Sequence, residues 1–204
     1  MKCLKLVSSS QNKVKEIRYN LRNTDIEIEA VDIDLPEYQA GMIRRPLKSN
    51  HSSASTESPE EVARLKTLEA VKTLNSGPVI IEDTSLCFNA LNGLPGVYIK
   101  WFLKKLGPEG LFKLLGAYDD KSAVAQTIFG YCEGPGEPVK LFPGKIDGEI
   151  VSPRGSREFG FDPCFLPKDS SLTYGEMTKD DKDKISHRVK ALAGLVEYLG
   201  SQNS

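Results

Sequence analysis

Residues 79–81 form an unbroken apolar run, Val-Ile-Ile, that is followed directly by Glu82 and Asp83. A continuous apolar run is typical of a strand that is buried on both faces of a sheet. Such a strand requires helices or loops to cover the sheet on either side. The run therefore favours a sheet with helices packed on it, which is an α/β or α+β arrangement.

The rest of the chain alternates between strand-like and helix-like segments, without an internal repeat. Short apolar or alternating segments predict further strands at residues 4–7, 26–33, 123–131 and 139–150. Apolar side chains at helical spacing predict helices near residues 14–21, 59–74, 98–106, 108–115 and 181–199. The turn at residues 133–137 is expected to pair the last two strands, and the order of the strands stays open.

Residues 40–57 are rich in Ser, Asn, Arg and Pro and have no apolar period. This composition favours a flexible insertion over a lid that carries Arg44 and Arg45. The length of 204 residues and the hydrophobic content of 39% fit a single domain, with room for two lobes.

The charges of the chain nearly cancel, with 27 basic and 28 acidic side chains. We therefore expect no general affinity for nucleic acid or membrane, and an anionic ligand must be bound by locally placed cations. No apolar stretch is long enough to span a membrane, and the N-terminus does not resemble a signal peptide. The four cysteines lie far apart without a C-x-x-C pair, so we expect buried thiols and a cytoplasmic location.

The first candidate site is the polar turn between the first strand and the first helix. Small hydroxyl residues at a helix start expose backbone N–H groups that can hold phosphate oxygens, and a lysine one turn later adds charge. The alternative is an ordinary serine cap followed by a solvated lysine. The residues concerned are Ser8, Ser9, Ser10, Gln11, Asn12 and Lys13.

The second candidate site is the acidic group Glu82, Asp83 and Thr84 at the predicted end of the buried strand. Carboxylates at a strand end suit a magnesium ion that arrives with a polyphosphate. Glu37, in the proline-containing segment 35–38, is a further candidate ligand from another strand end. The alternative is an acidic turn whose side chain bonds its own backbone.

Two later segments offer groups that could contact a nucleobase. Phe159, Gly160 and Phe161 lie in a Gly- and Pro-rich loop, where the rings can stack on a base or anchor the loop in the core. Asp162 before a proline is more often a turn residue. Lys182, His187 and Arg188 follow; because Lys182 and His187 are five positions apart, a helix must begin between them or they face different sides. A histidine beside an arginine is more often simply solvated.

Taken in order, these segments resemble the inosine triphosphate pyrophosphatase family, also called the Ham1-like family, and especially its eukaryotic members. The resemblance covers nearly the whole chain. Its most specific parts are IDLPEYQ at residues 33–39, EDTSLCFNAL at 82–91, GLPG at 93–96, YIKWFL at 98–103, FGFDPCF at 159–165 and SHR at 186–188.

The resemblance implies an elongated mixed α/β sheet with flanking helices, two lobes around a central nucleotide cleft, and a homodimer. It also implies a role for each matching residue. Ser8, Ser10 and Lys13 would hold phosphates, Lys66 and Lys182 would add charge, and Glu37 and Asp83, with Glu82 as a helper, would serve magnesium or manganese. Phe159, Phe161, Asp162, His187 and Arg188 would line the base pocket.

The sequence departs from the family pattern at three places. Ser8, Ser9 and Ser10 replace the usual Thr-Gly-Asn, the segment 42–56 is longer, and Phe161 stands where animal members have tryptophan.

The implied activity is hydrolysis of ITP, dITP and XTP to the monophosphate and pyrophosphate, which cleanses the nucleotide pool. Three alternatives remain at this point: a pyrophosphatase of the same fold with another triphosphate substrate, a nucleotide-binding protein without activity, and a phosphatase that releases orthophosphate.

Overall fold

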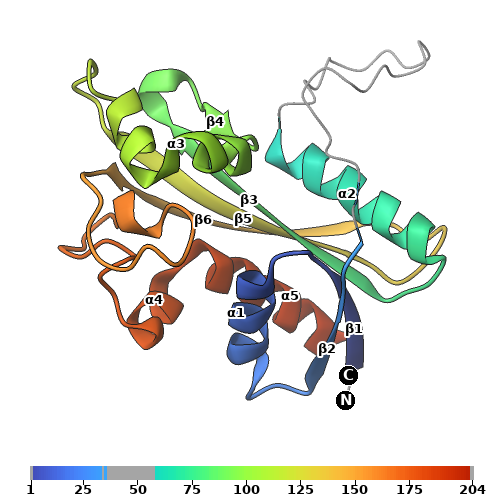
Figure 1. Ribbon diagram of the computed structural model, residues 1–204. Helices are drawn as coiled ribbons and strands as arrows, with labels where there is room; N and C mark the ends of the chain where they lie inside the picture. Colours follow the sequence, from blue (N-terminus) through green and yellow to red (C-terminus); the bar gives the residue numbers. More distant parts are fainter. Residues whose placement is uncertain (1, 34, 36–57, 203–204) are drawn as a thin grey trace, which may run out of the picture. The chain divides into compact units, whose positions relative to one another are not determined.

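A computed structural model of the protein describes residues 2–33, 35 and 58–202. Glu37 and the expected insertion at residues 40–57 lie outside the described residues. The helices are α1 (Gln11–Leu21), α2 (Pro59–Leu74), α3 (Ile99–Leu114), α4 (Lys179–Ile185) and α5 (His187–Ser201), shown in Figure 1. The strands are β1 (Lys2–Val7), β2 (Ile26–Val31), β3 (Val79–Phe88), β4 (Pro95–Gly96), β5 (Ser122–Cys132), β6 (Lys140–Ile150) and β7 (Phe165–Pro167).

The strands form one seven-stranded mixed sheet in the order β2-β1-β3-β5-β6-β7, with β4 paired to β3. Strand β1 runs parallel to both β2 and β3, whereas β4 on β3 and β7 on β6 are antiparallel. This arrangement confirms the predicted α/β class and the pairing of β5 with β6.

The chain divides into two compact units. Unit 1 comprises Met1–Asp83 and Ile128–Phe142, and unit 2 comprises Thr84–Thr127 and Pro143–Ser204. Strands β3, β5 and β6 each contribute residues to both units, so the boundary passes through β3 between Asp83 and Thr84.

The core of unit 1 confirms that residues 79–81 are buried on both faces. Val79 and Ile80 are 0% exposed and Ile81 is 2% exposed. Val79 and Ile81 pack against Ala63, Ala70 and other residues of α2. Helix α2 begins at Pro59, in agreement with the predicted range, and Ser58 is its N-cap with proline at its first position.

The core of unit 2 is assembled from α3, the strands and the loop that follows β6. It joins Leu86 and Phe88 of β3 to Phe161, Phe165 and Tyr174. Helix α3 contains a non-helical residue, Gly107, with φ 64° and ψ −179°, followed by Pro108. The prediction of two short helices separated at this Gly-Pro pair is thus correct in its essentials.

The prediction that Glu82 and Asp83 follow the end of a strand is wrong for β3, which continues to Phe88. The parallel pairing with β1 does end there, because its last aligned pair is Val7 with Ile81. The two carboxylates therefore lie within β3, immediately beyond the described end of its pairing with β1.

The prediction of one helix over residues 181–199 is also wrong. Ser186 has extended backbone, with φ −65° and ψ 151°, and it separates α4 from α5. Its hydroxyl accepts a hydrogen bond from Val189 N and caps α5. A second helix therefore begins at His187, after Lys182, which agrees with one of the two alternatives that the spacing of these residues left open.

The cysteines agree only in part with the expectation of buried thiols. All four are free thiols; Cys132 and Cys164 are buried, Cys87 is half-buried and Cys3 is exposed. Burial raises the pKa of the Cys164 thiol to about 12, so this thiol stays protonated and unreactive. Within the described ranges, no helix combines the length and apolar character needed to cross a lipid bilayer.

Candidate active site

The serines of the polar turn before α1 form hydrogen bonds within the turn and to the start of the helix. Ser10 is the N-cap of α1, and its Oγ accepts from Lys13 N at 3.4 Å, while Ser10 N donates to Ser8 Oγ at 3.2 Å. The serine cap and the proposed phosphate turn are compatible, because a capped helix start still carries the positive end of the helix dipole. Three side chains of the turn and the first helical turn are exposed: Ser9, Gln11 and Asn12.

Lys13 is held by a buried carboxylate. Its Nζ lies 2.5 Å from Glu82 Oε2, and the side chain of Glu82 is 0% exposed whereas that of Lys13 is 25% exposed. A carboxylate removed from water requires a cation close by, since an unpaired buried charge is strongly destabilising. Glu82 therefore fixes the position of the Lys13 ammonium group.

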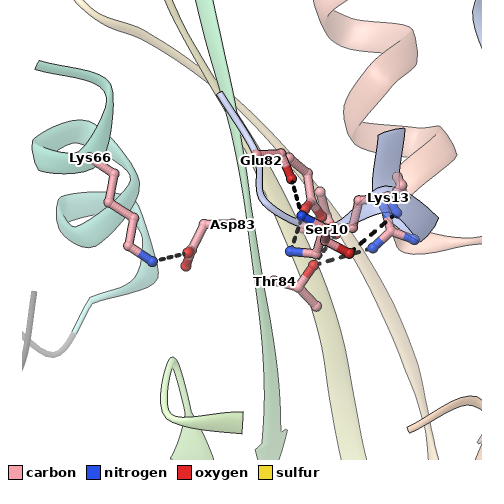
Figure 2. Close-up of polar contacts among 9 residues, drawn as sticks. Ser10, Lys13, Lys66, Glu82, Asp83 and Thr84 are labelled. Atoms are coloured by element: carbon pink, nitrogen blue, oxygen red, sulfur yellow. Dashed lines mark hydrogen bonds and ion pairs between the residues drawn. The ribbon is translucent and has the colours of Figure 1, made fainter. Parts of the chain in front are cut away.

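Asp83 makes the corresponding pair on the opposite face of β3. Lys66 Nζ from α2 lies 2.6 Å from Asp83 Oδ1, and the two side chains are 20% and 12% exposed. Successive residues of a strand point to opposite faces, so Glu82 is directed to α1 and Asp83 to α2. Figure 2 shows the two ion pairs on either side of the strand.

This alternation bears on the expected metal ligands. Glu82 and Asp83 cannot both point at one ion from a regular strand. Each is paired with a lysine, but the Glu82 side chain is 0% exposed whereas that of Asp83 is 12% exposed. Among the residues that the structure describes, no three His, Cys, Asp or Glu side chains gather as a metal site. Asp83 suits magnesium, which commonly uses one or two carboxylates together with substrate phosphates.

In unit 2, the loop that contains Phe159 and Phe161 places the Phe159 ring beside charged groups. It is half-buried, and Lys182 Nζ lies 4.4 Å from its centroid. The same Nζ lies 2.5 Å from Asp162 Oδ2, and both of these side chains are buried. Asp162 is therefore more than a turn residue, because it holds the ammonium group of Lys182 against the Phe159 ring.

Phe161 lies in the core of unit 2. It is 5% exposed and makes an edge contact with Phe165 at a centroid distance of 6.0 Å. Gly160 between the two rings has φ 44°, a conformation that favours glycine and lets consecutive aromatic residues diverge. The structure thus separates Phe159, beside the charged groups, from Phe161, the loop anchor.

The histidine and arginine at the start of α5 are buried, contrary to the reading of a solvated pair. His187 is 2% exposed, and its ring lies 5.7 Å from that of Phe161 and 5.8 Å from that of Tyr174. Arg188 is 1% exposed; its Cζ lies 5.1 Å from the Phe159 centroid, and its Nη2 donates to Thr84 Oγ1 at 3.4 Å.

The predicted residues therefore form two groups, one in each unit. The group in unit 1 contains the serine turn, Lys13, Lys66, Glu82 and Asp83. The group in unit 2 contains Thr84, Phe159, Asp162, Lys182 and Arg188, with His187 and Phe161 as its packed support.

Two residues that support the second group were not identified from the sequence. Thr127 contacts Thr84, at 3.2 Å between the hydroxyl oxygens, and Gly144 of β6 lies against the first turn of α5. Neither sits in a recognisable motif. The available signal was a glycine within a predicted strand, which often marks close backbone approach.

Gly144→Ala is expected to destabilise the protein by about 1–3 kcal/mol, because overpacking moves backbone. A Cβ at this position would lie 2.2 Å from His187 O and 2.4 Å from Ala191 N, so α5 must shift away from β6. Thermal or urea unfolding measures the effect. Gly200→Ala in α5 is the control, since a Cβ there meets nothing within 4 Å. Equal stability of the two variants would contradict the close packing of Gly144 against α5.

Comparison with known proteins agrees with this arrangement. Residues 4–198 match the model of the Ham1 family. A HAM1 protein from Coxiella burnetii has a similar structure, with a TM-score of 0.79 and 26% identity over 98% of this chain and 100% of that one. The Ham1 protein of Staphylococcus aureus gives a TM-score of 0.71 and 27% identity over 97% of this chain and 99% of that one.

A third similar structure, from Mycobacterium abscessus, is described as a nucleoside-triphosphatase and dITP/XTP pyrophosphatase. It gives a TM-score of 0.65 and 27% identity over 96% of this chain and 98% of that one. Since the family match extends over nearly all of the sequence and the described fold agrees with these structures, the chain belongs to the Ham1 family.

Proposed function

We propose that the protein hydrolyses the non-canonical purine nucleoside triphosphates ITP, dITP and XTP to the monophosphate and pyrophosphate. The observation that carries the proposal is the pair of lysines held on either face of β3, Lys13 by Glu82 and Lys66 by Asp83. Together with the family match and the activity ascribed to the Mycobacterium relative, this favours a polyphosphate substrate.

The phosphate chain would be bound by cations of unit 1. The start of α1 at Ser8 to Ser10 offers the positive end of a helix, and Lys13 and Lys66 supply point charges that are already positioned by carboxylates. Groups that are fixed before the reaction stabilise the charge that develops on the leaving pyrophosphate without reorganisation.

Asp83 would orient the attacking water and accept its proton. Asp83 and Glu37 would hold the magnesium ion, for which manganese is an alternative. A bound divalent ion neutralises phosphate charge and lowers the pKa of a coordinated water. Glu82, which is buried against Lys13 on the other face, is better suited to positioning that lysine than to binding the metal.

The base would be read by unit 2. Phe159 offers a ring for stacking, and Arg188 can only donate hydrogen bonds, which suits the 6-carbonyl of hypoxanthine and xanthine. Adenine carries an amino group at that position, so donor would face donor and polar groups would stay unpaired. Lys182, held on Asp162 against Phe159, is assigned to this base-reading group instead of to the phosphates.

A product assay tests the activity. Orthophosphate is measured with and without added inorganic pyrophosphatase, for ITP, dITP, XTP, ATP and GTP with magnesium. We expect orthophosphate from ITP, dITP and XTP only when the coupling enzyme is present, and much less from ATP and GTP. Release of orthophosphate without coupling would indicate a phosphatase, and a preference for ATP or GTP would indicate another substrate.

Further properties are proposed from the family resemblance. The eukaryotic type within the family is proposed from the resemblance of the segments taken in order. A homodimer acting in the cytoplasm, as one functional domain without nucleic-acid or membrane partners, fits this type and the near-neutral charge balance. Light scattering of the purified protein measures the dimer directly.

A further inference from the structure

Thr127 of β5 is a buried polar residue in contact with the base-reading group. Its side chain is 0% exposed, and its Oγ1 lies 3.2 Å from Thr84 Oγ1. Thr84 in turn accepts from Arg188 Nη2 at 3.4 Å. Thr127, Thr84 and Arg188 thus form a chain of side chains that joins β5, β3 and α5 within unit 2.

Thr84, the middle residue of these three, must keep one orientation to accept the hydrogen bond from Arg188. A guanidinium has no acceptor, so the hydroxyl oxygen of Thr84 is necessarily the acceptor of their bond. The same Thr84 hydroxyl contacts both Arg188 and Thr127, so the hydrogen bond to Thr127 favours the rotamer that reaches Arg188, whichever hydroxyl is the donor.

The bond between the Arg188 guanidinium and Thr84 is long at 3.4 Å, and the guanidinium Cζ lies 5.1 Å from the centroid of the Phe159 ring. A small rotation of Thr84 would remove the hydrogen bond, because such bonds weaken steeply with distance and angle.

We propose that Thr127 is a positioning residue for base selection, which holds Thr84 so that Arg188 presents its N–H groups to the 6-carbonyl of the purine. The inference rests on the proposed function. Thr127 touches neither the base nor the phosphates in this role and acts only through Thr84 and Arg188.

Thr127→Val tests the inference, because valine keeps the shape and suits a strand but lacks the hydroxyl. We expect kcat/KM for ITP to fall about three- to tenfold, the usual effect of one hydrogen bond. Residual turnover of ATP should stay unchanged, so the ITP to ATP ratio falls by the same factor. Thr127→Ser, which restores the hydroxyl, should recover the ratio.

The matched control is Thr67→Val in α2. Thr67 is also 0% exposed, but its hydroxyl donates to Ala63 O within its own helix. We expect this variant to keep the ITP to ATP ratio. Thermal melting of both variants tests whether they are folded. If Thr127→Val does not fold, Thr127→Cys replaces it, because cysteine is of similar size and has only a weak hydrogen-bond donor.

A double-mutant cycle with Thr84→Val shows whether the effect passes through Thr84. We expect Thr127→Val to cause almost no further loss when Thr84 is already valine, since coupled residues are not additive. Additive losses, equal losses for ITP and ATP, or an unchanged ratio in a folded Thr127→Val protein would each overturn the inference.

The wild-type protein separates this inference from the proposed function. If it releases no pyrophosphate from ITP, the proposed function fails and the inference fails with it. If it cleaves ITP normally while Thr127→Val keeps the wild-type ratio, only the role of Thr127 is contradicted.

Discussion

Replacing Asp83 by asparagine is expected to lower the turnover of ITP at saturating magnesium by about 10²- to 10³-fold, as for the loss of one preorganised catalytic group. Asparagine has the same shape and can still accept a hydrogen bond from Lys66, which lies 2.6 Å from the carboxylate. It cannot take a proton from water, and it is a weaker ligand for a hard cation. The loss should therefore appear in kcat, with little change in thermal stability.

Asp147→Asn is the matched control for this measurement. Asp147 is an exposed aspartate of another strand, β6, and belongs to neither candidate group. Its replacement should leave kcat within about twofold of wild type, as usual for surface substitutions. Full turnover of Asp83→Asn would show that this carboxylate neither activates water nor holds the metal.

The second large effect is expected at Arg188, whose replacement by alanine should lower kcat/KM for ITP by about 10- to 100-fold, the range for a hydrogen bond to a charged group. Residual turnover of ATP should fall much less, because ATP offers the guanidinium no acceptor at position 6. Arg188 is 1% exposed, so its removal also leaves a cavity and should lower the melting temperature.

The comparison between substrates separates base reading from this loss of stability. A general loosening of the protein lowers the turnover of both triphosphates, and only a specific contact changes their ratio. Arg157→Ala is the control, because that arginine is in the same unit but 56% exposed and paired with Glu109. If Arg188→Ala reduced ITP and ATP turnover equally, Arg188 would have no part in base selection.

Much of the fold could be predicted from local patterns. The helical spacing of apolar residues in α1 and α2 and the apolar run at residues 79–81 each depend on neighbours in the sequence, and the structure confirms them. The continuation of β3 through Glu82 and Asp83 could not be predicted in this way. Two carboxylates normally disfavour a strand, and here distant lysines on two helices pair with them.

The site was predictable as a set of residues but not as a set of contacts. The motifs identified Lys13, Glu82 and Asp83, yet only tertiary packing shows which carboxylate faces which lysine. The burial of His187 and Arg188 likewise depends on aromatic rings from elsewhere in the chain. Thr127 carried no signal, because a threonine in a strand is ordinary and its partner is 43 residues away.

Three consecutive residues of β3 each engage a different helix. Glu82 contacts Lys13 of α1, Asp83 contacts Lys66 of α2, and Thr84 contacts Arg188 of α5. Side chains of a strand alternate in direction, so the gain or loss of one residue would turn every later side chain to the opposite face. A substitution in this segment therefore removes a single contact, whereas a change in its length would separate several helices from their partners in a single step.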